Sequence, residues 1–166
     1  LVYTPARDPK KLAVVGAGPA GLAFSTAAVE CGHQVVLYEQ TDRIGGQLNL
    51  ARQVPGKLEF EQTLKYFQQQ LARLGVEVRL NTFATARELS TAGYDAVIVA
   101  TGILPRRVDI PGHDHPSVLS YIDVLAHKAP VGKRVAIVGA GGIGFDVALY
   151  LTHEASDDSL DREAFL

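Results

Sequence analysis

Short apolar runs alternate with segments of helical periodicity along this chain of 166 residues. Runs of this length, bounded by glycine or polar residues, predict β-strands. The predicted strands span residues 11–15, 34–38, 76–81 and 94–100. The first and the last are apolar enough to predict strands that are buried on both faces, as strands of parallel sheets are. An alternation of such strands with helices is typical of an α/β fold, and we predict a Rossmann-like, doubly wound parallel sheet.

The clearest helix is predicted between Leu58 and Leu74. Its apolar residues recur at helical spacing, and Gly75 is placed to end it. These residues, which we assign to the core, are Phe60, Leu64, Phe67, Leu71 and Leu74. Shorter helices are predicted at 23–31, 86–89, 118–128 and 145–153.

The first apolar run enters a glycine turn of the form GxGxxG, made by Gly16, Gly18 and Gly21. Gly16 permits a sharp turn, Gly18 lets a pyrophosphate approach the backbone, and Gly21 lets the following helix pack closely on the strand. Pro19 and Ala20 begin that helix, whose N-terminus points unpaired N–H groups at an anion. The turn therefore predicts a site for the pyrophosphate of a dinucleotide.

An acidic residue stands where such a site needs one. The strand predicted at 34–38 ends in Glu39, eighteen residues after Gly21. A carboxylate at about this spacing accepts hydrogen bonds from an adenosine ribose. The alternative is a strand–helix–strand unit that binds no nucleotide, because glycine turns are common. The strand, turn, helix and acid in succession favour a dinucleotide site.

A second pair of glycines follows Glu39 after a short loop. Gly45 and Gly46 suggest another close approach of the backbone, and Gln47 offers a side-chain amide that can donate and accept hydrogen bonds. We expect this loop to fold over the ribose and pyrophosphate of a bound cofactor. The alternative is an ordinary Gly-Gly turn.

The opening pattern recurs near the end of the chain. An apolar run at 134–138 predicts a further strand that enters a second GxGxxG turn, and a helix follows. This second turn comprises Gly139, Gly141, Gly142, Ile143 and Gly144. The sequence from Glu154 onward is acidic and polar, so we expect this unit to lack its next strand and the last turn to be frayed or packed on a neighbouring molecule. Since the chain also contains no methionine, we expect a fragment of a longer protein.

Composition excludes several functions. The formal net charge of -2 gives no electrostatic case for nucleic acid, and no apolar run is long enough for a membrane span. The single cysteine, Cys31, allows neither a disulfide nor a dithiol pair within the chain. The five histidines show no metal-ligand spacing. We therefore expect a cytoplasmic protein and assign no metal ligand and no catalytic residue.

Several motifs together resemble a known family. The first glycine turn, Glu39, Ile44–Gln47 and Ala100–Gly102 are similar to the FAD-binding half of flavoproteins with two dinucleotide-binding domains. Residues 45–60, with the sequence GGQLNLARQVPGKLEF, narrow the resemblance, as do 118–125 followed by 129–133. Together they resemble the bacterial 2,4-dienoyl-CoA reductases of the NADH:flavin oxidoreductase and trimethylamine dehydrogenase family.

The resemblance implies a linker at 1–10, an FAD-binding Rossmann-like domain at 11–132 and the incomplete start of an NADPH-binding domain at 133–166. In that family, a barrel domain preceding this part carries FMN beside a 4Fe-4S cluster. Electrons pass from NADPH through FAD and the cluster to FMN, and then to an unsaturated acyl-CoA. The parent protein is then an enzyme, whereas we expect this chain alone to be inactive.

The resemblance also implies which residues contact the cofactors. The first glycine turn would cradle the FAD pyrophosphate, Glu39 would hold the ribose, and the backbone at Ala84 would border the adenine. The second turn would take the nicotinamide nucleotide. Expected cofactor-binding residues are Gly16, Gly18, Pro19, Ala20, Gly21, Glu39, Gln40, Gly46, Gln47, Ala84, Ala100, Thr101, Gly102, Gly139, Gly141, Gly142, Ile143 and Gly144.

Two other functions stay open. In relatives of trimethylamine dehydrogenase, the equivalent site resembles a redox-inert module that binds ADP for structural reasons. The other function is that of a small NAD(P)H:FAD reductase subunit, which passes electrons to a separate partner protein, as in glutamate synthase relatives. The glycine turn and Glu39 fit all three, because the ligands share an ADP group.

Overall fold

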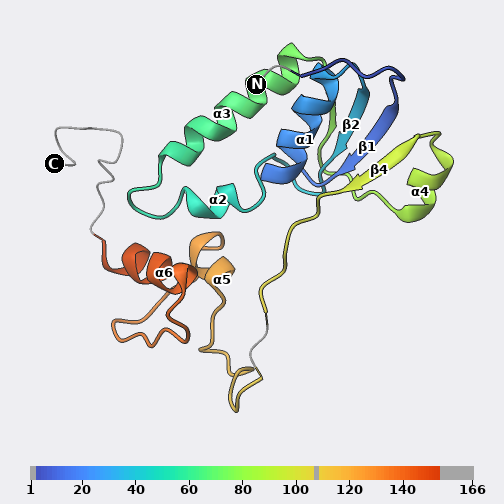
Figure 1. Ribbon diagram of the computed structural model, residues 1–166. Coiled ribbons are helices and arrows are strands. Elements are labelled where there is room, and N and C mark those ends of the chain that lie inside the picture. The colour runs from blue at the N-terminus through green and yellow to red at the C-terminus, as the bar shows by residue number, and fades with distance from the viewer. Residues whose placement is uncertain (1–2, 107–108, 154–166) are drawn as a thin grey trace, which may run out of the picture. The chain divides into compact units, whose positions relative to one another are not determined.

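The structure, a computed structural model, describes residues 3–106 and 109–153. The chain divides into two compact units. Unit 1 contains the chain up to Leu48 together with Gln62–Gly102, and unit 2 contains Asn49–Glu61 together with the residues from Ile103 onward. Each unit is therefore built from two stretches that are separated in the sequence (Figure 1).

A parallel sheet forms the centre of unit 1 (Figure 1). Its described strands are β1 (Lys11–Val15), β2 (Gln34–Tyr38), β3 (Glu77–Arg79) and β4 (Ala96–Val99). They lie in the order β3-β2-β1-β4, with Leu12 opposite Val35 on one side and Ala96 on the other. The chain steps from β1 outward to β2 and β3 and then returns to the other side of β1 as β4. The predicted Rossmann-like parallel sheet is confirmed.

Helices α1 (Pro19–Glu30) and α3 (Glu59–Arg73) cover one face of this sheet (Figure 1). Successive residues of a strand point to opposite faces, so alternate residues of β1 and β2 contribute to this core. Its buried residues are Leu12, Val14, Ala17, Leu22, Ala28, Val35, Leu37 and Leu71. The predicted core face of α3 is confirmed at Leu64 and Leu71, which are buried. Gly75 follows the helix with a φ of +69°.

The opposite face carries a smaller cluster next to α4 (Ala86–Thr91). Buried Ala13, Val36 and Tyr38 pack there with Ala84, Leu89 and Tyr94. The Tyr38 and Tyr94 hydroxyls lie 2.7 Å apart, and Arg79 Nη1 donates to the Tyr38 hydroxyl at 3.0 Å. Burial, followed by the hydrogen bond to Tyr38, raises the pKa of Tyr94 to about 12.

The last strand of unit 1 differs from its prediction. β4 is shorter than the predicted 94–100, and it lies at an edge of the described sheet instead of being buried on both faces. Val97 and Val99 are 41% and 74% exposed, whereas Ile98 between them packs on the core below α1. Among the described residues, the smaller cluster covers β1 and β2 and does not extend to β4.

Unit 2 is held together by a small apolar core and two lysines. Its described helices include α5 (Tyr121–Leu125) and α6 (Gly142–Thr152). Most of the short helix α2 (Leu48–Ala51), which was not predicted, also belongs to this unit. Val54, Val124, Leu125 and Val147 are buried together. Lys57 Nζ donates to both carboxylate oxygens of Asp146 in α6, at 2.7 and 2.8 Å. Lys128 Nζ donates to Gln53 at 2.8 Å and to the Tyr150 hydroxyl at 3.0 Å.

The strand predicted at 134–138 does not form. Within residues 109–153, this segment pairs with no other strand, and its Val138 side chain is 75% exposed. A strand needs a neighbour to take up its backbone hydrogen bonds, and the described part of unit 2 offers none. The fraying predicted from Glu154 concerns residues outside those that the structure describes. No helix of the described residues is long and apolar enough to cross a bilayer.

Candidate dinucleotide-binding site

The first glycine turn lies at the carboxyl end of β1, beside the end of β4. Gly16 has a φ of +103°, and its N–H donates to the Tyr38 carbonyl at 2.8 Å. A Cβ at Gly16 would overlap the carbonyl group of Ala100. Only glycine therefore fits here, for reasons of both backbone conformation and space.

The next two glycines of the turn face different surroundings. A Cβ at Gly21 would overlap the carbonyl of Gly16, so this residue permits the close packing of α1 on the turn. A Cβ at Gly18 would meet no atom within 4 Å, so the backbone there faces open space. Gly18 also caps α1, with no side-chain hydrogen bond to the cap from the described residues. The first N–H groups of α1 are thus available to an anion beside Gly18.

The predicted element Ala100–Gly102 follows β4 and lies next to this turn. The Ala100 N–H donates to the Val15 carbonyl at 2.8 Å, and the Cα of Thr101 would lie 3.2 Å from a Cβ on Gly16. β1 and β4 are the neighbours between which the strand order reverses. Ligands of open α/β sheets bind beyond the carboxyl ends of strands at such a point.

The second pair of glycines packs on the first turn. The Gly45 N–H donates to the Ala17 carbonyl at 2.7 Å, and a Cβ on Gly46 would lie 3.0 Å from the Cα of Gly18. Gly46 has a φ of +50°. The structure therefore brings this loop against the first glycine turn. An ordinary Gly-Gly turn would not need to make such a contact. Gln40 and Gln47 are exposed on either side of the pair.

Glu39 is buried at the end of β2 and is held by the surrounding backbone. It is 8% exposed. Its Oε2 accepts a hydrogen bond from the Ala17 N–H at 2.9 Å, and its Oε1 accepts from the Thr41 N–H and hydroxyl, both at 2.9 Å. The Ala17 bond joins the acid directly to the glycine turn. Glu39 and the turn are therefore neighbours in one candidate site.

The nearby Arg43 forms an ion pair with Asp42 and not with Glu39. Arg43 donates to both carboxylate oxygens of Asp42, at 2.7 and 2.8 Å, and this hydrogen bonding lowers the pKa of Asp42. Arg43 is thus occupied, and no salt bridge to Glu39 is found within the described residues. The Glu39 carboxylate is stabilised by N–H and O–H donors.

Ala84 lies beyond β3, on the segment that passes Glu39. The Thr82 N–H donates to the Glu39 carbonyl at 2.9 Å, which brings this segment to the same edge of the sheet. The Ala84 side chain packs with Tyr38 and Tyr94 in the smaller cluster. Any contact of Ala84 with a nucleotide must therefore come from its backbone.

The second glycine turn, in unit 2, has the same local geometry as the first. Gly139 has a φ of +113°, and a Cβ on Gly144 would overlap the Gly139 carbonyl, as one on Gly21 would overlap that of Gly16. Gly141 caps α6 with φ and ψ of -87° and -179°, close to the -75° and -178° of Gly18. A Cβ on Gly141 or Gly142 would meet no described atom within 4 Å. The turn is thus formed although the strand before it is not.

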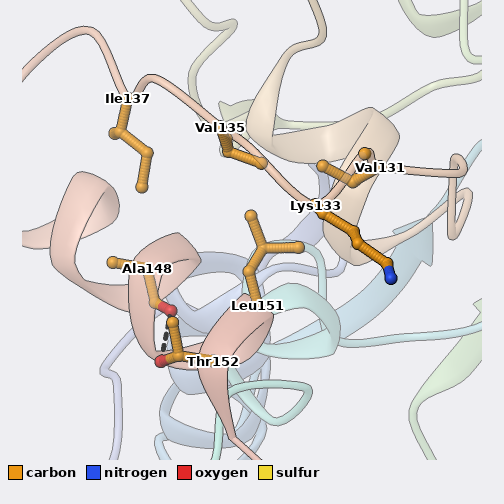
Figure 2. A pocket seen from close by; sticks show the side chains of 8 residues that line it. Val131, Lys133, Val135, Ile137, Ala148, Leu151 and Thr152 are labelled. Atoms are coloured by element: carbon orange, nitrogen blue, oxygen red, sulfur yellow. Dashed lines mark hydrogen bonds between the residues drawn. The ribbon is translucent and has the colours of Figure 1, made fainter.

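Unit 2 contains a cavity of about 360 Å³ (Figure 2). Val131, Val135, Ile137, Ala148 and Leu151 line it with apolar groups, and the Thr152 hydroxyl at its edge donates to the Ala148 carbonyl at 2.9 Å. None of the glycines from 139 to 144 lines it. The cavity therefore lies under the segment predicted as a strand and is no part of the candidate nucleotide site.

The residues of unit 1 fit the ADP half of a dinucleotide. The open space at Gly18 beside the N-terminus of α1 suits a pyrophosphate, and the carboxylate of Glu39 suits ribose hydroxyls. Sequence reasoning found both, but it missed Thr41 and the N–H of Ala17 as partners of Glu39. Neither carries a sequence signal, because a threonine two residues after an acid is common in loops.

Comparisons with known proteins agree with this geometry. The family model for pyridine nucleotide-disulphide oxidoreductase matches residues 10–160. A metal reductase of Desulforamulus reducens is 37% identical over 167 residues, covering 98% of this chain and 25% of that protein. An NADH oxidase of Thermoanaerobacter brockii is 38% identical over 151 residues, covering 89% of this chain and 23% of that protein.

Among solved structures, a 2-naphthoyl-CoA reductase in complex with 2-naphthoyl-CoA is similar, with a TM-score of 0.86 and 35% identity. The similarity covers 90% of this chain and 23% of that one. The chain thus spans about a quarter of the length of the relatives that it matches.

Proposed function

The chain belongs to the pyridine nucleotide-disulphide oxidoreductase family, and we propose that unit 1 binds FAD through its ADP half. The observation that carries the proposal is the open backbone at Gly18, which lies between the N-terminus of α1 and the Gly46 loop. Gly18 and Pro19–Gly21 would hold the pyrophosphate, Glu39 the ribose, and Ala100–Gly102 the part of the cofactor at the end of β4. Gln40, Gln47 and the backbone of Ala84 would border it.

The second glycine turn supports a site for a nicotinamide nucleotide, which we take to be NADPH. Gly139, Gly141 and Gly144 repeat the geometry of the first turn, and Gly142 and Ile143 begin α6 beside it. We propose that the FAD-binding domain spans 11–132 and that the start of an NADPH-binding domain follows from 133. The first glycine turn and Glu39 would hold FAD, which would supply the capacity to accept a hydride from a nicotinamide and to release electrons one at a time.

The whole protein is proposed to be an NAD(P)H-dependent flavin oxidoreductase of the 2,4-dienoyl-CoA reductase kind. Its relatives are named as reductases and an NADH oxidase, and one of them acts on a CoA thioester by its name. This chain holds one cysteine, so it contains no dithiol pair to accept the electrons. A 4Fe-4S cluster and FMN in a barrel domain of the protein would take them instead.

The test is an absorbance spectrum of the purified chain after addition of FAD and removal of the unbound flavin. The proposal predicts flavin bands that stay with the protein and are lost when ADP is added. Gly18→Ala is the matched variant, because its added methyl group enters the open space without touching described atoms. It should fold and retain no flavin.

Other outcomes separate the alternatives. Binding of ADP without retention of FAD would contradict the flavin proposal and favour a structural ADP-binding module. Binding of neither ligand would contradict any nucleotide site in unit 1. Flavin that is retained equally by Gly18→Ala would place FAD elsewhere on the chain.

A further inference from the structure

We propose that Thr41 is a positioning residue, which orients the Glu39 carboxylate toward the ribose hydroxyls of a bound adenine nucleotide. The inference rests on the proposed function of unit 1 and adds a specific role for one side chain. Thr41 itself is exposed and lies in the loop between Glu39 and the Gly45–Gly46 pair.

The Glu39 carboxylate is fixed from two sides. On one side, the Ala17 N–H binds Oε2 at 2.9 Å, and on the other the Thr41 N–H and hydroxyl bind Oε1, each at 2.9 Å. Because both carboxylate oxygens are bound, these three donors together fix the orientation of the carboxylate. Hydrogen bonds to a charged acceptor are stronger than neutral ones, so this orientation is firmly held. The Thr41 hydroxyl is the only one of the three that a substitution can remove without changing the backbone.

The burial of Glu39 explains why such donors are needed. An ionised carboxylate that is 8% exposed loses most of its hydration, and this loss is costly unless hydrogen bonds or a cation replace it. The neighbouring Arg43 pairs with Asp42 at 2.7 and 2.8 Å instead. Thr41 therefore stabilises the buried Glu39 carboxylate by hydrogen bonds, where many buried acids are stabilised by a cation. Because no positive charge neutralises it, the carboxylate keeps its negative charge for the binding of a ligand's hydroxyl groups.

The arrangement limits what Glu39 can bind. A carboxylate offers about four acceptor positions, and Ala17 and Thr41 together occupy three of them. The Thr41 hydroxyl has a single proton, and its Oγ also lies 3.0 Å from the Arg43 carbonyl, so the charged Oε1 is the stronger of two competing acceptors. The position that remains is on Oε2, which accepts one hydrogen bond from the described residues, whereas Oε1 accepts two. A ribose hydroxyl can donate to it, whereas a 2′-phosphate would be repelled.

The experiment is calorimetric titration of the full chain with ADP and with 2′,3′-dideoxy-ADP, which lacks both ribose hydroxyls. The variants are Thr41→Val and Thr41→Ser. Thr91→Val is the control, because the Thr91 hydroxyl donates only to backbone carbonyls within α4. Thr41→Ala replaces Thr41→Val if the latter does not fold, as judged by thermal unfolding.

We expect Thr41→Val to weaken ADP binding roughly two- to tenfold, as the loss of one hydrogen bond implies. It should leave the affinity for 2′,3′-dideoxy-ADP unchanged, since that ligand has no hydroxyl for Glu39 to bind. Thr41→Ser should bind ADP as the unmodified chain does. In a Glu39→Gln background, Thr41→Val should have no further effect.

Equal weakening for both ligands would overturn the inference, because it would indicate a structural role. Unchanged ADP affinity in Thr41→Val, or no recovery in Thr41→Ser, would overturn it as well. In each of these cases the unmodified chain still binds ADP, so the nucleotide site of unit 1 stands, and the absorbance spectrum with FAD tests the flavin proposal separately. No binding of ADP by the unmodified chain would overturn the proposed function and this inference together.

Discussion

Gly46 packs against the backbone of Gly18, and a Cβ on Gly46 would lie 3.0 Å from the Gly18 Cα. The first glycine turn and the Gly45–Gly46 pair, which are separated in the sequence by α1, β2 and a loop, thus meet at the N-terminus of α1. The Gly45 N–H strengthens the contact by donating to the Ala17 carbonyl at 2.7 Å. In the candidate pyrophosphate site, the positions of the first glycine turn and of the Gly45–Gly46 loop therefore depend on each other.

Substitution of Gly46 should damage binding more than stability. In Gly46→Ala, the φ of +50° costs roughly 1–2 kcal/mol for a residue with a Cβ, and the methyl group presses on Gly18. Gly93→Ala is the matched control, since Gly93 has a φ of +69° and open space around it. Urea unfolding should show a loss of stability for both variants, while only Gly46→Ala should lose affinity for ADP. Equal ADP affinity in the two variants would contradict the contact between the glycine pairs as part of the site.

Substitution by alanine should affect mainly nucleotide binding at Gly18 and mainly stability at Gly21. Gly18→Ala should cost less than about 1 kcal/mol, the range of a poorer helix cap, and should abolish nucleotide binding. Gly21→Ala should cost about 1–3 kcal/mol or more, because its methyl group would overlap the Gly16 carbonyl and push α1 from the turn. Denaturant unfolding and ADP titration of both variants measure this difference. A stable Gly21→Ala chain would show that the helix does not pack as closely as described.

Stability should show an acid-dependent contribution from the cap of α5. The Ser120 hydroxyl and N–H donate to Asp123 at 2.7 and 2.9 Å, and these bonds lower the pKa of Asp123. A carboxyl with a lowered folded-state pKa stabilises the fold above its unfolded pKa, and this contribution is lost as the pH falls through the folded pKa. Ser120→Ala should cost about 1 kcal/mol at neutral pH and less in acid. An equal cost at both pH values would contradict the role of the charged Asp123.

Tyr94 should ionise only at high pH. Burial and the hydrogen bond to Tyr38 raise its pKa to about 12. Because the folded-state pKa exceeds the unfolded value of 10.0, this group favours the folded state below pH 10 and loses that effect as the pH rises toward 12. Ultraviolet titration of tyrosinate should show a transition near pH 12, which moves to lower pH in Tyr38→Phe. A Tyr38→Phe titration identical to that of the unmodified chain would contradict the coupling.

The ion pair between Lys57 and Asp146 should contribute modestly to unit 2. Both side chains are about one-third exposed, so we expect a coupling of roughly 0.5–1 kcal/mol in a double-mutant cycle with Lys57→Met and Asp146→Asn. The coupling should shrink in high salt. The same cycle on the more exposed pair of Arg43 and Asp42 should give a smaller value. A larger coupling there would contradict the dependence on burial.

The local pattern of the sequence predicted much of unit 1. The strand at Gln34–Tyr38 has its predicted bounds, because apolar residues between a glycine turn and an acid leave little choice. The helix at Glu59–Arg73 follows from its apolar face and from Gly75. The two glycine turns were predicted with their flanking helices, since the positive φ of Gly16 and the contact of Gly21 with the Gly16 carbonyl are local.

Features that depend on distant partners could not be read from the pattern. An apolar run such as 134–138 has strand propensity, but pairing requires a neighbour, and the described residues supply none. Val97 and Val99 are apolar whether or not a layer covers them, so the exposed edge at β4 was missed. Asn49–Glu61 belongs to unit 2 through contacts with distant residues, such as that of Lys57 with Asp146, which lies 89 residues away. The role of Thr41 likewise emerges only from the fold around Glu39.

The most direct test is a crystal structure of the chain with ADP, because two turns of the same geometry compete for it. Our account predicts the pyrophosphate at Gly18 and the N-terminus of α1, with a ribose hydroxyl on Glu39. ADP bound only at the turn from Gly139 to Gly144, or bound without contact to Glu39, would contradict the account.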